Sequence, residues 1–253
     1  MQASDITLTN LDVRAFIYGR PGTAKTWSAA SFCSKDKQDC YIFDFDAGTL
    51  TLRNFRNVTG KNPLFDTYAR EVGSWERMAV KLEALKKDSS IRTIVFDSLT
   101  TLAEVKIEEV LRKNSKPRMT LEMWGVFIGE IELFFGNLST FKGKNIVMTA
   151  HEFNDKDENT GEIMTQPLIY GKNLPSKIPL WFDEVYHTEV VQKGVEFLYI
   201  WRTRATARYT GKTRLGFLPT ECPADFEFVR KLVEAEQAKE VKLNAGVTAQ
   251  AKA

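Results

Sequence analysis

Residues 13–27 read VRAFIYGRPGTAKTW, and the octet GRPGTAKT at 19–26 constrains the fold more than any other stretch. It fits the phosphate-binding pattern G-x-x-x-x-G-K-[ST] at every fixed position but one, where Ala24 replaces the second glycine. Such a loop needs a strand before it and a helix after it, because backbone N–H groups and the helix dipole together hold the anion. An apolar run precedes the octet, and residues 27–33 follow it without a helix breaker. The stretch therefore predicts a strand, a phosphate loop and a helix.

Three residues of this loop have an expected role. Lys25 would reach the terminal phosphates as a point charge, and the Thr26 hydroxyl would bind Mg²⁺. Ala24 is expected to open the helix with φ below zero, where a methyl group is tolerated. The alternative is a glycine-containing turn before a helix that happens to start with lysine. The predicted nucleotide-binding residues are Gly19, Arg20, Pro21, Gly22, Thr23, Ala24, Lys25, Thr26 and Trp27.

Composition limits the class of protein. A chain of 253 residues is long enough for one large α/β domain or two small ones, and 43% apolar and 27% charged residues are typical of a globular protein. No apolar run reaches the length of a membrane span and the first ten residues lack a signal-peptide layout, so we expect a cytoplasmic location. A net charge of +2 means that any nucleic-acid site must be local. Three cysteines without metal-ligand spacing are expected to be buried, namely Cys33, Cys40 and Cys222.

Strand and helix patterns alternate along the chain. Short apolar runs at 40–46, 63–68, 91–96 and 144–150 predict strands, and helical spacing predicts helices over 74–87, 99–111 and 121–138. The fold class expected from this alternation is α/β, a mainly parallel sheet flanked by helices on both faces.

The remaining segments complete the predicted domain. Two alternating runs at 184–191 and 195–203 predict an antiparallel C-terminal hairpin that extends the sheet. The polar segment 154–165 predicts a mobile loop. We expect an N-terminal arm at 1–12, a single domain over 13–240 and a disordered tail at 241–253.

Three predicted strands end in residues suited to a nucleotide site. The carboxyl ends of parallel strands share one edge of the sheet, so Gly19, Asp46 and Asp97 should lie together there. Asp97, which closes TIVFD, suits a carboxylate that holds Mg²⁺ or its waters, and its alternative role is the N-cap of the next helix. Asp44 and Asp46 lie on the same face of their strand, so either could activate water.

The order GRPGTAKT, IFDFDAG, TIVFDS, IVMTAHE and TGKTR resembles the RecA-like P-loop ATPases, most closely the small phage recombination ATPases with single-strand-annealing activity. The resemblance covers residues 13–218. It implies a RecA-like P-loop core that uses ATP and Mg²⁺, and hydrolysis that DNA or oligomerisation stimulates. It also implies single-stranded DNA, further copies of the chain and a single-strand-binding protein as partners, no membrane, and the bacterial host cytoplasm if the chain is phage-encoded.

The resemblance also assigns catalytic roles to individual residues. Asp46 matches the acidic residue that orients the attacking water, and His151 matches the polar residue that senses the γ-phosphate. Lys212 and Arg214 match basic fingers that enter a neighbouring subunit's nucleotide. The alternatives are a hydrogen-bonded core histidine for His151 and a solvated loop for the basic pair.

Two segments correspond to the DNA-binding loops of the RecA-like recombinases. The first, 113–120, carries the predicted DNA-binding residues Lys113, Lys116 and Arg118, and its charge suits phosphate contacts. The second, 151–172, carries several carboxylates that would repel a DNA backbone.

The leading hypothesis is a Mg²⁺-dependent ATPase that acts on single-stranded DNA in phage-type recombination or annealing. One alternative is a nucleotide-gated switch or loader for a partner protein. The other is a P-loop kinase of a small molecule, for which no arginine-rich lid stands out.

Overall fold

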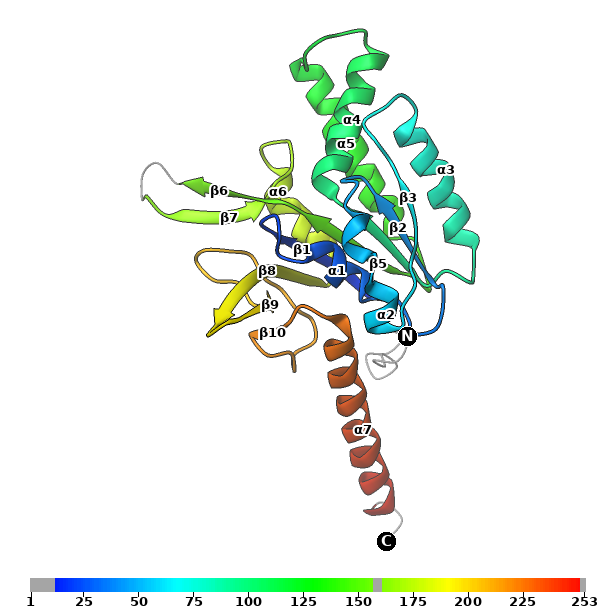
Figure 1. The fold of residues 1–253 in the computed structure, drawn as a ribbon, viewed down its shortest axis with the longest axis vertical. Helices are drawn as coiled ribbons and strands as arrows, with labels where there is room; N and C mark the ends of the chain where they lie inside the picture. The colour runs from blue at the N-terminus through cyan, green and yellow to red at the C-terminus, as the bar shows by residue number, and fades with distance from the viewer. Residues whose placement is uncertain (1–11, 157–160, 251–253) are drawn as a thin grey trace.

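The computed structural model describes residues 12–156 and 161–250 (Figure 1). Its central feature is an eight-stranded sheet made of β1 (Arg14–Gly19), β2 (Cys40–Asp44), β3 (Leu64–Thr67), β4 (Thr93–Asp97), β5 (Asn145–Ala150), β8 (Glu184–Lys193), β9 (Glu196–Arg202) and β10 (Glu221–Pro223). The strand order is β10-β9-β8-β1-β5-β4-β2-β3. All neighbours pair in parallel except β8 with β9 and β9 with β10. The expected fold class and the β8–β9 hairpin are confirmed.

The strand order decides where the site can form. β5 lies between β1 and β4, so the strand before the phosphate loop and the strand that ends in Asp97 are not adjacent. Parallel pairing nevertheless brings the carboxyl ends of β1, β5, β4 and β2 to one edge of the sheet. That edge is where loops of a parallel α/β sheet gather ligands.

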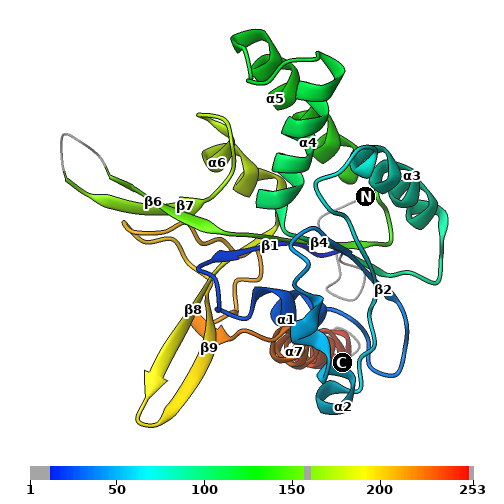
Figure 2. The same ribbon diagram turned by 45° about the horizontal axis from the view of Figure 1, so that its top comes forward.

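Helices cover both faces of the sheet (Figure 2). One layer holds α1 (Lys25–Ala30), α2 (Phe55–Thr59) and α7 (Phe226–Gln250), and the other holds α3 (Ser74–Lys87), α4 (Leu99–Lys113), α5 (Leu121–Leu138) and α6 (Leu174–Lys177). Short 3₁₀ turns η3 (Thr49–Leu52) and η4 (Ile178–Trp181) complete the elements. Alternate residues of β1 enter opposite cores, Phe16 on the α4 and α5 side and Ile17 on the α1 and α7 side.

Two expectations about the polar segments are corrected. The segment expected to be a mobile loop, 154–165, contributes instead to an antiparallel pair, β6 (Glu152–Lys156) with β7 (Ile163–Pro167). Its pairing is reinforced outside the hairpin, because the Thr165 N–H donates to the Arg208 carbonyl oxygen at 2.6 Å. The tail was expected to be disordered from 241, whereas α7 continues to Gln250 and meets no proline on the way.

Other expectations concern single residues or segments at the chain ends. Cys33, Cys40 and Cys222 are buried free thiols, as the sequence predicts. The predicted arm at 1–12 lies outside the described residues except for Asp12, and residues 251–253 lie outside them as well. Within the described ranges, no helix is long and apolar enough to cross a membrane.

Trp201 anchors the core between the sheet and α7. It is fully buried and stacks on Tyr186 with ring centroids 4.6 Å apart. We predict that Trp201→Ala lowers the free energy of unfolding by about 3–5 kcal/mol. Trp201→Phe should cost less than half of that, because it also removes a buried indole N–H that no described residue accepts. Urea unfolding followed by circular dichroism measures both, and equal losses would contradict the packing argument.

Candidate functional site

The phosphate loop is shaped by close backbone contacts at its start. A side-chain carbon at Gly19 would lie 2.5 Å from the Thr188 carbonyl oxygen, so only glycine fits there. Thr23 is buried, and its hydroxyl donates to the Arg20 carbonyl oxygen at 2.8 Å. The Thr188 hydroxyl donates to the Thr23 carbonyl oxygen at 2.9 Å. β8 therefore fastens the loop from the side.

Ala24 does not have the backbone conformation expected from the sequence. It has φ 60° and ψ 30°, in the left-handed region, and the expected negative φ is wrong. The reason is that α1 begins at Lys25, so that Ala24 is the N-cap where the loop reverses and not a helical residue. Glycine reaches this region freely, whereas alanine does so at a cost of about 1–2 kcal/mol.

The charged side chain of Lys25 folds back onto the phosphate loop and binds its backbone. The side-chain amine donates to the carbonyl oxygens of Gly19 at 3.0 Å and Arg20 at 2.8 Å. Burial lowers the pKa of Lys25, and the carboxylates of Asp97 and Asp46 oppose that shift. A phosphate would be a stronger acceptor for this amine than two neutral carbonyls.

Asp97 joins the end of β4 to the start of α1. One carboxylate oxygen accepts from the Thr26 hydroxyl at 2.6 Å, and the other accepts from the Thr149 hydroxyl. Burial raises the pKa of Asp97 despite these hydrogen bonds, and the charge of Asp46 adds to the rise. The N-cap of α4 is Ser98, so Asp97 does not serve as the cap.

The Thr26 and Asp97 pair fits a magnesium site. Mg²⁺ prefers oxygen ligands and usually takes one or two from the protein, with phosphates and waters supplying the rest. Within residues 12–156 and 161–250, no group of three or more His, Cys, Asp or Glu side chains could hold a metal. These donors therefore suit a cation that arrives with a nucleotide.

Asp46 and Asp44 occupy different environments. Asp46 lies beyond the end of β2, where Ser98 Oγ donates to Oδ1 at 3.0 Å, Thr101 also donates, and His151 Nε2 lies 3.3 Å from Oδ2. Burial acts to raise the pKa of Asp46, but these hydrogen bonds outweigh it and hold the pKa below its usual value. Asp44 is fully buried and accepts from the Gly48 N–H at 3.1 Å, so it holds the turn that carries Asp46.

These groups surround one cavity of about 790 Å³. The predicted residues that line it are Pro21, Gly22, Ala24, Lys25, Thr26, Trp27, Asp46, Asp97 and His151. Sequence reasoning missed its other walls, made by Gly48, Thr51, Phe197, Leu198, Tyr199, Pro223, Ala224 and Asp225. The only sequence signal for these was a pair of aromatic residues in a predicted edge hairpin.

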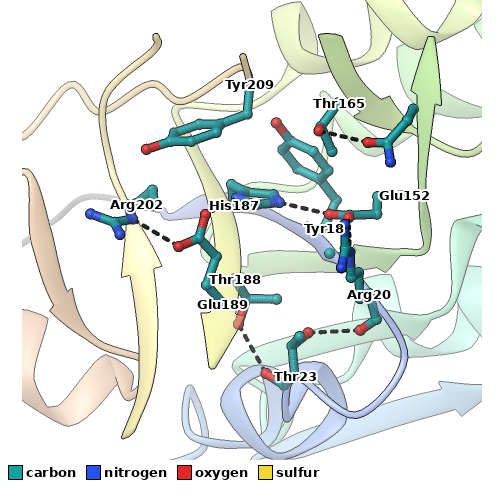
Figure 3. A network of polar contacts seen from close by, with 12 residues as sticks. Tyr18, Arg20, Thr23, Glu152, Thr165, His187, Thr188, Glu189, Arg202 and Tyr209 are labelled. Carbon is teal, nitrogen blue, oxygen red and sulfur yellow. Dashed lines mark hydrogen bonds and ion pairs between the residues drawn. The ribbon is translucent and has the colours of Figure 1, made fainter. Parts of the chain in front are cut away.

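Arg20 points away from the cavity into a second polar cluster, shown in Figure 3. Its Nε donates to Glu152 Oε1 at 3.1 Å, and Glu152 Oε2 lies 2.7 Å from His187 Nε2. His187 Nδ1 is 3.2 Å from Glu189, and the Tyr209 ring stacks on the imidazole at 4.8 Å. Burial would raise the pKa of Glu152, yet the contacts with His187 and Arg20 hold it below its usual value. This cluster ties the phosphate loop to the start of β6.

The predicted DNA-binding residues lie far from the cavity. Lys113 ends α4, and Lys116 and Arg118 follow it in the loop to α5, so the 15 residues of α4, about 22 Å long, separate them from Asp97 (Figure 1). Lys113 forms ion pairs with Glu109 and Glu76. Lys116 and Arg118 are exposed.

Lys212 and Arg214 lie away from the phosphate loop, toward the edge of the sheet where the parallel strands begin. Lys212 pairs through its backbone with Val185, beside the middle of β1, and its amine donates to carbonyl oxygens of Phe182 and Pro179. Arg214 forms a 2.8 Å ion pair with Asp183, and its side chain is 66% exposed. Neither side chain approaches the phosphate loop of its own chain.

Comparison with known proteins gives a family. A model of the family described as the AAA domain matches residues 11–215. No curated protein matches the chain. Among solved structures, the KaiC-like protein PH0186 from the hyperthermophilic archaeon Pyrococcus horikoshii OT3 aligns with a TM-score of 0.42 and 13% identity over 84% of each chain.

The left-handed Ala24 leads to a test of the loop. We predict that Ala24→Gly raises the free energy of unfolding by roughly 0.5–1 kcal/mol, because relief of the backbone cost exceeds the entropy that glycine adds to the unfolded chain. Ala29→Gly is the matched control, since Ala29 lies inside α1, where glycine should cost about 1 kcal/mol. Urea unfolding measures both variants. A loss of stability in Ala24→Gly would contradict the strained loop.

Proposed function

Because this chain belongs to the AAA domain family and has the fold of a P-loop ATPase, we propose that it binds and hydrolyses ATP with Mg²⁺ and acts on single-stranded DNA. ATP hydrolysis on single-stranded DNA would serve recombination or strand annealing, as the resemblance to the small phage ATPases suggests. Oligomeric assembly belongs to the same proposal.

One observation carries the nucleotide part of the proposal. The cavity of about 790 Å³ brings together an amine, a hydroxyl paired with a carboxylate, and a second carboxylate paired with an imidazole. These groups match the needs of phosphoryl transfer, where catalysis consists of positioning and charge stabilisation. Lys25 would bind the terminal phosphates, and Thr26 and Asp97 would hold Mg²⁺. When bound, the cation would neutralise charge on the phosphates.

Asp46 is the group best placed to act on water. Its pKa is held below the usual value, so it stays ionised at neutral pH and can accept a proton or orient the attacking water. The His151 ring contacts the Asp46 carboxylate, and the backbone N–H of His151 donates to Thr100 Oγ1 at 3.0 Å. A γ-phosphate near this pair would change the contact between Asp46 and His151, which suits a sensing role.

The water-activating role predicts a separation of binding from hydrolysis. Asp46→Asn should bind ATP with an affinity close to that of the wild type and hydrolyse it ~10²- to 10⁴-fold more slowly. Asp44→Asn serves as the control, because Asp44 supports a turn and lies outside the cavity walls. Calorimetric titration and a phosphate-release assay measure the two quantities. The assignment fails if Asp44→Asn alone abolishes hydrolysis while ATP binding is retained.

The DNA part of the proposal rests on the exposed α4–α5 loop. Lys116 and Arg118 have no ion-pair partner among the described residues, so their charges are available to phosphates. Lys113 is held by two glutamates and contributes less. The β6–β7 hairpin carries carboxylates and suits DNA poorly.

Neutralising this loop should weaken DNA binding and its salt dependence. The logarithm of the affinity falls as the logarithm of the salt concentration rises. For Lys116→Gln with Arg118→Gln, we predict that this slope becomes shallower by about 0.7 for each lost contact with single-stranded DNA. Lys87→Gln with Lys142→Gln removes the same charge from exposed positions elsewhere and is the control. Fluorescence anisotropy of a labelled oligonucleotide over a salt series measures the slope. An unchanged slope in the loop variant would remove DNA contacts from this loop.

The oligomeric part of the proposal centres on Arg214. Lys212 is engaged with carbonyl oxygens of its own chain, whereas the Arg214 side chain is largely exposed and far from its own phosphate loop. A guanidinium that reaches a neighbouring nucleotide would stabilise charge in the transition state.

A mixing experiment tests whether Arg214 acts between subunits. Lys25→Ala and Arg214→Ala should each be inactive alone, and mixing them should restore part of the activity, because some interfaces pair an intact loop with an intact arginine. Arg208→Ala mixed with Lys25→Ala is the control for other arginines of the same region. No recovery in oligomers that demonstrably contain both chains would confine Arg214 to its own subunit.

A nucleotide-gated switch or loader is the second candidate. The Arg20, Glu152 and His187 cluster favours it, since it links the phosphate loop to a hairpin that could meet a partner. ATP turnover with and without single-stranded DNA separates the two candidates. Stimulated turnover supports the DNA-dependent ATPase, and tight ATP binding with negligible turnover in both cases supports the switch.

A further inference from the structure

The β8–β9 hairpin reaches beyond the sheet edge that carries the phosphate loop. β8 pairs with β1 only as far as Thr188, opposite Gly19, and then continues to Lys193. Five residues at the usual rise extend it by about 16 Å. β9 returns along this extension, with Tyr199 opposite Val190 and Phe197 opposite Gln192. The hairpin therefore overhangs the loop and forms a wall of the cavity.

One face of β9 carries a row of aromatic rings that leaves the core. Phe197, Tyr199 and Trp201 alternate along the strand and so share a face. Trp201 is fully buried, whereas Tyr199 is 46% and Phe197 is 62% exposed. The core packing that covers Trp201 does not cover the outer two rings, which line the cavity instead.

The end of β10 and the chain that leads into α7 also line this part of the cavity, beside β9. The Ala224 N–H donates to the Tyr199 carbonyl oxygen at 3.0 Å, which fixes Pro223 and Asp225 beside the strand. Asp225 caps the following turn, since its Oδ1 accepts from the Glu227 N–H at 2.9 Å. No hydrogen bond to the other carboxylate oxygen occurs among the described residues, which leaves an acceptor at the cavity rim.

The cavity thus has a charged half and an apolar half. Lys25, Asp97 and Asp46 occupy the first, and the aromatic residues of β9 with Pro223 occupy the second. A ligand that matches both halves carries a polyphosphate at one end and a flat ring at the other.

We propose that Phe197 and Tyr199 form a stacking platform for the base of the nucleotide, and that this platform accepts purine nucleoside triphosphates in general instead of ATP alone. The inference rests on the proposed nucleotide site. Stacking on aromatic side chains tolerates different bases, because every base offers a π face. Adenine carries its amino group at position 6 and guanine carries its own at position 2, and Asp225 can accept an N–H from either when the base turns on the platform. The apolar half has no further charged side chain to tell the two apart.

Calorimetric titration with three ligands tests the platform. Mg-ATP, Mg-GTP and magnesium tripolyphosphate, which lacks a base, are titrated into the wild type, Phe197→Ala and Tyr199→Ala. The alanine variants should bind both nucleotides roughly 5- to 150-fold more weakly, the range measured for loss of one stacking partner, with tripolyphosphate affinity unchanged. Val195→Ala is the matched control, because Val195 lies in the same hairpin, is 93% exposed and does not line the cavity.

The outcomes separate the inference from the function beneath it. Unchanged ATP and GTP affinity in both variants, or an equal loss for tripolyphosphate, overturns the platform while leaving a nucleotide site. A preference of the wild type for ATP over GTP of more than about a hundredfold overturns the tolerance for purines. A wild type that binds neither tripolyphosphate nor nucleotide overturns the proposed function and the platform with it.

Discussion

Parallel pairing of β1, β5, β4 and β2 is the constraint on which the site depends. Because Tyr18 pairs with Ala150 and Asp44 with Asp97, four strand ends stop at nearly the same level. The 2.6 Å hydrogen bond from Thr26 to Asp97 then joins the start of α1, which follows β1, to the end of β4, although β1 and β4 are not neighbours in the sheet. A slip of one residue would turn Asp97 to the other face and break that link.

Burial explains the charge balance of the cavity. It lowers the pKa of Lys25 and raises the pKa of Asp97, so both groups shift toward their neutral forms for the same physical reason. Asp46 departs from this pattern, because the hydrogen bonds from His151, Thr101 and Ser98 favour its charged form. A polyphosphate with its cation would supply partners for Lys25 and Asp97, which is why this arrangement suits a nucleotide better than an empty structural core.

The sequence predicted what local patterns encode, and missed what depends on distant segments. Apolar and alternating runs located every strand of the sheet except β10, and the octet located Lys25 and Thr26. The left-handed Ala24 could not be read from the motif, because it depends on where α1 begins. The β6–β7 hairpin looked like a loop, since its polar residues are stabilised by a contact with Arg208 that is remote in sequence. In the sequence, Tyr199 was only one aromatic residue of a predicted hairpin, and its place in the cavity wall depends on the pairing of β9 with β8.

Direct binding of Mg-ATP tests the central claim, that the closed phosphate loop around Lys25 is a nucleotide site. Calorimetric titration of the full chain should give one site per chain. Lys25→Ala should weaken binding by at least about tenfold through loss of charge-assisted hydrogen bonds, with an unchanged circular dichroism spectrum. The same affinity in both proteins would contradict the account, because the nucleotide would then bind away from this loop.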